Sequence, residues 1–216
     1  EVQPLMIDAS EIRRGLTSVR TGMEDREAYG KLVTVHERIR DEEATTGEVS
    51  AETHWRLAVS QLAAQDIDGY RTTCKAMLRH FGIDSEDSWA KEMTAWVVAL
   101  YENPEKDVSQ AIAVALQLVE QRRNATNLRV LAACLFRAGR VEEAHQMLRE
   151  ALPGSKRPAY VFCLLALTSQ ELGRVDEAKT WLDKVDLSIH ANEKVYWVTR
   201  ATIHLLRNQA LAATGG

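Results

Sequence analysis

Cysteine, proline and long apolar runs are all scarce in this sequence. Its three cysteines, Cys74, Cys134 and Cys163, are an odd number and include no C-x-x-C pair, so we expect reduced and buried thiols. No stretch approaches the roughly 18 uninterrupted apolar residues of a membrane-spanning helix. No segment alternates apolar and polar residues with a period of two, so we expect no strands and an all-α chain.

An excess of positive charge is also absent. Lysine and arginine number 27 against 31 aspartates and glutamates, which gives a formal net charge of −4, and the basic residues are interspersed among the acidic ones. Proteins that bind nucleic acid or an anionic membrane through charge carry clustered basic residues. We therefore expect neither nucleic acid nor a membrane as a partner.

The motifs of the common enzyme classes are missing as well. The chain has no P-loop, nucleophile elbow or zincin motif, and its six histidines are scattered. His80-Phe81-Gly82 looks like the metal-binding Asp-Phe-Gly of kinases, but imidazole does not replace the carboxylate that Mg²⁺ prefers, so we interpret it as a helix end stopped by glycine. Arg122-Arg123 suits a helix C-terminus, with a phosphate site as the alternative. We expect no catalytic residue, cofactor or metal site in this chain.

One stretch of sequence is written twice. LAACLFRAGRVEEAHQML at 131–148 matches LALTSQELGRVDEAKTWL at 165–182, and the glycines at their centres, Gly139 and Gly173, are 34 residues apart (173 − 139). In each copy an apolar helical pattern runs to the glycine, and a second helix with acids in its first turn follows. Ala144 and Ala178 are small where the two helices touch. Such a period predicts helix-turn-helix units that must stack to bury their apolar faces.

The remaining helices can be assigned in the same phase. We expect one domain over residues 1–216, a right-handed solenoid of antiparallel helical hairpins in which the last helix caps the stack. The clear repeats are 125–156 and 159–188, the degenerate hairpins are 10–43, 51–82 and 86–122, and the capping helix is 191–208.

The repeated unit resembles the tetratricopeptide (TPR) family. More narrowly, the blocks Gly-Tyr-Arg-x-x-Cys at 69–74 and Gly-Arg-x-x-Glu-Ala at 139–144 and 173–178 resemble the C-terminal TPR region of large bacterial Ser/Thr protein kinases and related WD-repeat proteins. The resemblance covers about residues 50–210 and implies a cytoplasmic, non-catalytic region that follows a kinase or propeller module.

The chain departs from that family in two places. The connection at 153–158 is shorter than the family's loop, and the first 50 residues have no match in it. The sequence also begins at Glu1, without a methionine or a signal-like segment, so we expect a part excised from a longer polypeptide. A leader on that parent stays open.

The first helices of the pairs supply the candidate binding site. TPR-like stacks bind peptides along an inner face, and here that face is an apolar strip whose rim carries two arginines, whereas apolar Val130 and Ala133 stand where a carboxylate clamp needs polar residues. The alternative is that neighbouring helices or the C-terminal helix fill the strip as core. The predicted peptide groove consists of Trp96, Leu100, Arg129, Phe136, Arg137 and Leu167.

These observations favour a non-catalytic scaffold that binds a protein or peptide, as the C-terminal part of a larger multidomain bacterial signalling protein. Two alternatives remain open. One is a regulatory or docking region of a Ser/Thr kinase whose catalytic domain lies upstream, and the other is a homo-oligomerisation module.

The repeat phase can be tested by filling the small helix contacts. Ala144→Leu and Ala178→Leu should each overpack an interhelical contact and lower the free energy of unfolding by roughly 1 to 3 kcal/mol in a denaturant titration. Variants that unfold like the parent would show that the phase is misassigned.

Overall fold

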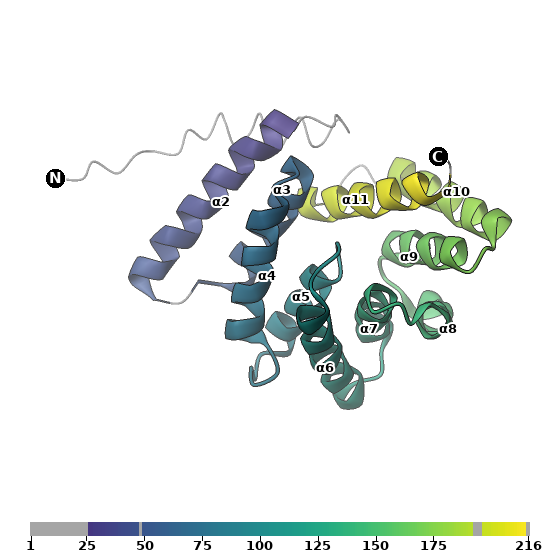
Figure 1. Ribbon diagram of the computed structural model, residues 1–216, viewed down its shortest axis with the longest axis horizontal. Helices are drawn as coiled ribbons and strands as arrows, with labels where there is room; N and C mark the ends of the chain where they lie inside the picture. Colours follow the sequence, from purple (N-terminus) through teal and green to yellow (C-terminus); the bar gives the residue numbers. More distant parts are fainter. Residues whose placement is uncertain (1–25, 48, 192–195, 215–216) are drawn as a thin grey trace.

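Helices alone make up the regular structure of the described residues, which are 26–47, 49–191 and 196–214 of this computed structural model (Figure 1). The predicted all-α fold is confirmed there. The helices are α2 (Arg26–Thr46), α3 (Ala51–Ala64), α4 (Ile67–Phe81), α5 (Ser88–Val98), α6 (Glu105–Gln121), α7 (Ala125–Arg137), α8 (Val141–Ala151), the 3-10 turn η1 (Leu152–Gly154), α9 (Pro158–Glu171), α10 (Val175–Ala191) and α11 (Trp197–Thr214).

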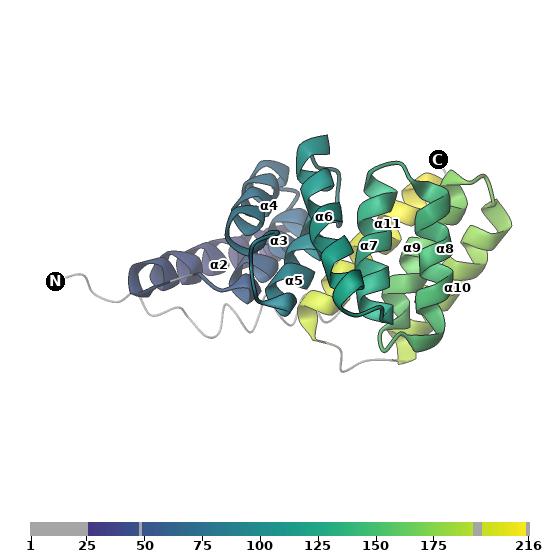
Figure 2. The ribbon, with the colours of Figure 1, turned by 90° about the horizontal axis from the view of Figure 1, so that it is seen from below.

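Most of the helices pair with their neighbour in the chain. α3 packs with α4, α5 with α6, α7 with α8 and α9 with α10, and the pairs stack side by side into a curved solenoid (Figures 1 and 2). The first helix of one pair also contacts the first helix of the next, so α3, α5, α7 and α9 form an inner layer. α4, α6, α8 and α10 form the outer layer.

Polar side chains begin several of these helices. Ser50, Asp66, Asp87 and Asn124 each accept a hydrogen bond from a backbone N–H in the first turn of α3, α4, α5 and α7 respectively. Such caps satisfy donors that have no partner inside the helix. The short polar residues in the connections therefore set where the helices begin.

The two repeated glycines end their helices in the same way. Gly139 has φ 74° and Gly173 has φ 72°, both in the left-handed region. The residue after each glycine donates its N–H back to the helix, from Arg140 to the carbonyl of Leu135 at 2.9 Å and from Arg174 to that of Ser169 at 2.8 Å. The predicted ends of these two helices at glycine are confirmed. Ala144 and Ala178 are both fully buried, as the repeat phase requires.

The turn between α3 and α4 reaches the same geometry without glycine. Gln65 follows α3 with φ 63°, the one left-handed non-glycine residue in the described part of the chain. Its N–H is bonded to the carbonyl of Leu62. A side chain in this region costs about 1 to 2 kcal/mol relative to the right-handed form, so packing around the turn must hold it.

Several predicted boundaries differ from the structure. The first part of the hairpin predicted at 10–43 lies outside the described residues, and α2 packs on α3 and continues to Thr46. The capping helix predicted at 191–208 runs over Trp197–Thr214 instead, because Ala191 still belongs to α10. No glycine or proline separates α10 from α11 in the sequence, so the periodicity alone did not show where one helix ends and the next begins.

A pair of matched substitutions separates backbone strain from helix propensity. A Cβ atom added at Gly139 or at Gly30, inside α2, would meet nothing within 4 Å, so neither substitution creates a clash. Gly139→Ala should destabilise by about 1 to 2 kcal/mol because of its left-handed φ, whereas Gly30→Ala should stabilise by about 0.5 to 1 kcal/mol. Urea unfolding measures both, and changes of the same sign would contradict the assignment.

Candidate functional site

The structure buries most of the predicted peptide groove. Trp96, Leu100, Arg129 and Leu167 are only 2%, 1%, 7% and 5% exposed, and Phe136 and Arg137 are half-buried. As the chain is folded here, these residues do not line an open groove. The binding of a partner at these residues stays a prediction.

Arg129 lies among aromatic rings and not at a solvent-exposed rim. Its guanidinium is 4.1 Å from the ring centroid of Trp96 and 4.9 Å from that of Tyr160, and these two rings are 5.1 Å apart. Its nearest acid is Glu92, with Nη2 and Oε1 separated by 3.7 Å. Burial lowers the pKa of Arg129 and raises that of Glu92, so each charge depends on the other. We therefore assign Arg129 to the core between α5, α7 and α9.

Arg137 connects three parts of the chain through backbone carbonyls. Its Nε donates to the carbonyl of Ala99 at 2.9 Å and its Nη2 to that of Leu100 at 2.8 Å. Nη2 also donates to Oε1 of Gln209 in α11 at 2.5 Å, while Nε2 of Gln209 donates to the carbonyl of Leu100 at 2.9 Å. Its Nε and Nη2 donors are thus bonded inside the molecule, whereas the sequence predicted a rim arginine that steers a partner.

The covering element is α11. This helix runs along the inner side of the stack, where it contacts α3, α9 and α10 (Figures 1 and 2). Its apolar stripe, Val198, Ala201, Leu206 and Ala210, is buried against them. The sequence left two outcomes open for the apolar strip, a binding groove or a core filled by neighbouring helices or by the C-terminal helix. In this structure both fill it: Tyr160 of α9 packs on Trp96, and Gln209 of α11 reaches the carbonyl of Leu100.

Polar contacts hold α11 along its length. Gln170 of α9 donates from Nε2 to the carbonyl of Ala213 at 2.7 Å. Arg207 binds the carboxylate of Asp186 in α10 through two bonds of 2.6 and 3.0 Å. Paired bonds between arginine and carboxylate fix geometry as well as charge. Neither Gln209 nor Arg207 stood out in the sequence, because their partners are far away along the chain.

The first turn of α11 packs on α2. The ring of Trp197 stacks on that of His36 with centroids 5.6 Å apart and an interplanar angle of 11°, and Nδ1 of His36 is 3.0 Å from Oγ of Ser60 in α3. Burial, and then the positive charge of Arg56, lower the pKa of His36 to about 4. The imidazole is therefore neutral at pH 7, and it joins α2, α3 and α11.

The described residues hold no candidate metal cluster and no activated thiol. No group of three or more His, Cys, Asp or Glu among them is placed to hold a metal ion. The three cysteines are free and buried, as predicted, and burial raises the pKa of Cys74 and of Cys134 to about 12 and that of Cys163 further. Thiols of such high pKa are poor nucleophiles at neutral pH. No helix in the described part of the chain is long and apolar enough to cross a membrane.

Comparisons with known proteins agree on the fold. The family model described as anaphase-promoting complex, cyclosome, subunit 3 matches residues 105–185, which span α6 to α10. A thermophilic TPR protein of Thermus thermophilus is similar in structure, with a TM-score of 0.54 and 18% identity over 85% of this chain and 95% of that one. The chain is therefore a TPR-like solenoid.

Two further solved structures are similar at a lower level. MamA AMB-1 gives a TM-score of 0.44 with 15% identity over 84% of this chain and 98% of that one. MamA MSR-1 gives 0.43 with 15% identity over 84% and 95%. No curated protein matches the sequence significantly.

The buried imidazole predicts a dependence of stability on pH. Because folding lowers the pKa of His36 from 6.5 to about 4, the unfolded chain binds the proton more readily, and stability contributed by the neutral ring is lost as the pH falls from 6.5 to 4. The loss should approach about 3 kcal/mol at the acid end. His36→Gln should show a smaller fall in the free energy of unfolding between about pH 7 and about pH 4.5, and an unchanged slope would assign the dependence to other groups.

Proposed function

We propose that this chain is a non-catalytic TPR-like scaffold for protein–protein interaction, and that its inner face binds one amphipathic helix. The observation that carries the proposal is α11 itself. The inner layer of α3, α5, α7 and α9 already holds one helix along its length, which supports the idea that a helix of similar pattern from a partner can be held there.

The contacts of α11 describe what such a helix needs. Small and apolar side chains, Ala201, Leu206 and Ala210, fit the apolar strip. A glutamine at the position of Gln209 reaches both Arg137 and the carbonyl of Leu100, and these two bonds fix the register of the helix on the stack. Anchors of this kind, buried at the centre of an interface, dominate binding energy.

We further propose that the whole chain is one TPR-like domain of a larger, cytoplasmic bacterial signalling protein. The resemblance to the C-terminal TPR region of Ser/Thr kinases and WD-repeat proteins supports this setting. A docking region of such a kinase and a self-association module are the alternatives. The sequence that precedes Glu1 in the parent gene decides between them, because the motifs of a kinase domain are easy to identify.

Adjacent substitutions in α11 test the inner face. Ala210 is fully buried and Leu211 is 40% exposed, so Ala210→Glu places a charge in the contact whereas Leu211→Glu places the same charge at the surface. Ala210→Glu should release α11, and a fluorescent peptide copy of residues 197–214 should then bind this variant in trans. The parent and Leu211→Glu should not bind the peptide.

Circular dichroism separates release from unfolding. If the Ala210→Glu variant keeps the helicity of α2 to α10 and binds the peptide, the inner face is an exchangeable site for a helix. Loss of the whole fold, or a folded variant that ignores the peptide, would show that α11 is an inseparable part of the core and would refute the proposal.

A further inference from the structure

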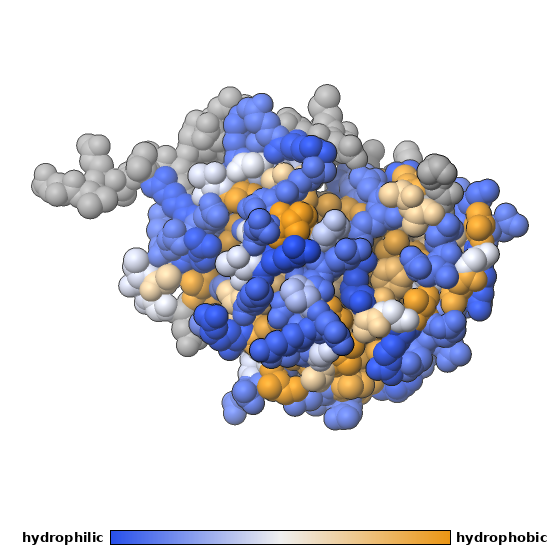
Figure 3. Space-filling view, viewed as in Figure 1, coloured by the Kyte–Doolittle hydropathy of each residue, from blue (hydrophilic) through white to orange (hydrophobic). Residues whose placement is uncertain are grey.

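A cleft with several charged residues along its walls lies between two helices of the outer layer, α4 and α6. It has a volume of about 540 Å³ and is lined by Lys75, Leu78 and Arg79 of α4 and by Lys106, Asp107 and Gln110 of α6. Hydrophilic residues cover most of the surface in view where these helices lie (Figure 3). Since α11 contacts α3, α9 and α10, this cleft remains open while the inner face is covered.

The α4 side of the cleft carries a column of positive charge. Arg71, Lys75 and Arg79 are four residues apart and therefore share one face of the helix. None of them, nor Lys106 opposite, forms an ion pair with another described residue, although many arginines elsewhere are paired, as Arg123 is with Glu150. Cations gathered in this way repel one another, and none of them is ion-paired with Asp107, the acid that lines the cleft.

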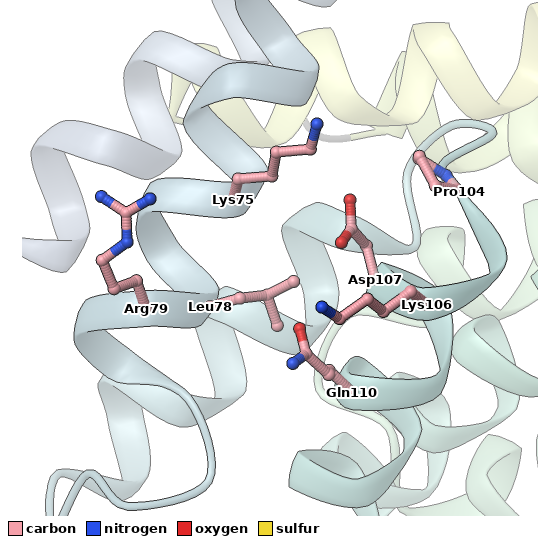
Figure 4. Close-up of a pocket in the computed structure, with 7 residues that line it drawn as sticks. All are labelled: Lys75, Leu78, Arg79, Pro104, Lys106, Asp107 and Gln110. Carbon is pink, nitrogen blue, oxygen red and sulfur yellow. The ribbon is translucent and has the colours of Figure 1, made fainter.

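Asp107 gives the cleft an unsatisfied hydrogen-bond acceptor in addition to its positive charges. Its side chain is in the first turn of α6, it is only 7% exposed, and its Oδ2 is enclosed without a hydrogen-bond partner in the described structure. Figure 4 shows its carboxylate in the space between α4 and α6, toward which Lys75 and Lys106 also extend. Buried acceptors are nearly always satisfied, so a ligand that fits this cleft brings a hydrogen-bond donor as well as negative charge.

We propose that the α4–α6 cleft binds an acidic peptide segment of a partner protein. Carboxylates of the segment face Lys75 and Lys106, with Arg71 and Arg79 extending the positive surface along α4, and a backbone N–H of the segment donates to Asp107. Leu78 supplies an apolar contact between the charges. This inference rests on the proposed scaffold function and assigns a second site to it, distinct from the inner face.

A peptide fits the cleft better than a nucleic acid does. No aromatic ring lines the cleft on which a base would stack. Asp107 repels a phosphate that has no donor to offer, and the net charge of −4 opposes a long polyanion outside the cleft. A short acidic segment avoids both penalties because its charges alternate with N–H donors.

Charge reversals in the full chain test the site. A fluorescein-labelled peptide of alternating glutamate and alanine, followed by fluorescence anisotropy, should bind the parent and weaken as salt is added. Lys106→Glu and Lys75→Glu should each weaken binding at least about tenfold. Lys179→Glu, the same change on an exposed residue of α10, should stay within about twofold of the parent. Thermal unfolding should show that all three variants are folded.

Competition identifies the ligand class. Inorganic phosphate should compete poorly with the peptide on the parent and better on Asp107→Asn, because that variant lacks the charge that repels a bare anion. Equal loss in Lys179→Glu and Lys106→Glu, absence of peptide binding by the parent, phosphate competing as well as peptide, or single-stranded DNA binding as tightly as peptide would each overturn the inference. Binding of the 197–214 peptide to Ala210→Glu reports separately on the inner face, so the two proposals fail independently.

Discussion

α11 packs on the inner layer of the stack, and this contact closes the apolar core of the molecule. A stack of helix pairs covers the outer side of its first helices with its second helices, but it leaves the inner side without a layer. Here Trp96, Leu100 and Leu167 are almost entirely out of contact with solvent, because neighbouring inner helices pack around them and α11 lies over the stack. A large apolar strip exposed to solvent marks either a binding interface or a site of aggregation. Because α11 lies along the strip, the strip is not exposed to solvent.

The polar contacts of α11 set its register on the stack, and its apolar contacts supply the free energy of packing. Leu206 and Ala210 are fully buried, and such burial has no direction. Gln209 and Arg137 both bond to the carbonyl of Leu100, and these bonds admit one register. Hydrogen bonds to charged groups contribute about 1.5 to 3 kcal/mol each, and losing one partner leaves a buried charge unsatisfied. Arg137 therefore helps to fix the position of α11 along the stack.

This arrangement divides the molecule into two surfaces with different chemistry. The inner face is apolar, is covered, and accepts a helix. The α4–α6 cleft is open, carries Lys75 and Lys106 without ion-pair partners in the described structure, and encloses the unsatisfied Asp107. On our two proposals, the chain holds its own helix on the inner face while it binds an acidic segment on the outer side. Neither surface requires the other to open, because they lie on different layers of the stack.

The helical pairs and their 34-residue period were predictable from the sequence (173 − 139). Gly139 and Gly173 take left-handed φ values because backbone sterics at a helix end favour glycine there, and the buried Ala144 and Ala178 follow from the same period. These features depend on residues a few positions apart, so a single sequence records them. The left-handed Gln65 could not be predicted in this way, because no glycine marks its turn in the sequence.

The role of the inner strip follows from contacts between distant parts of the chain. Periodicity shows which side of a helix is apolar, but the stripe of a core and the stripe of a groove are the same pattern. The difference lies in whether α11 covers it, and the bond that seats α11, from Gln209 to Leu100, joins residues 109 positions apart. The proton affinity of His36 and the juxtaposition of Lys75 with Lys106 likewise come from helices that meet only after folding. Contacts of that range leave no local signal, which is why the fold could be predicted from the sequence and the occupancy of its inner face could not.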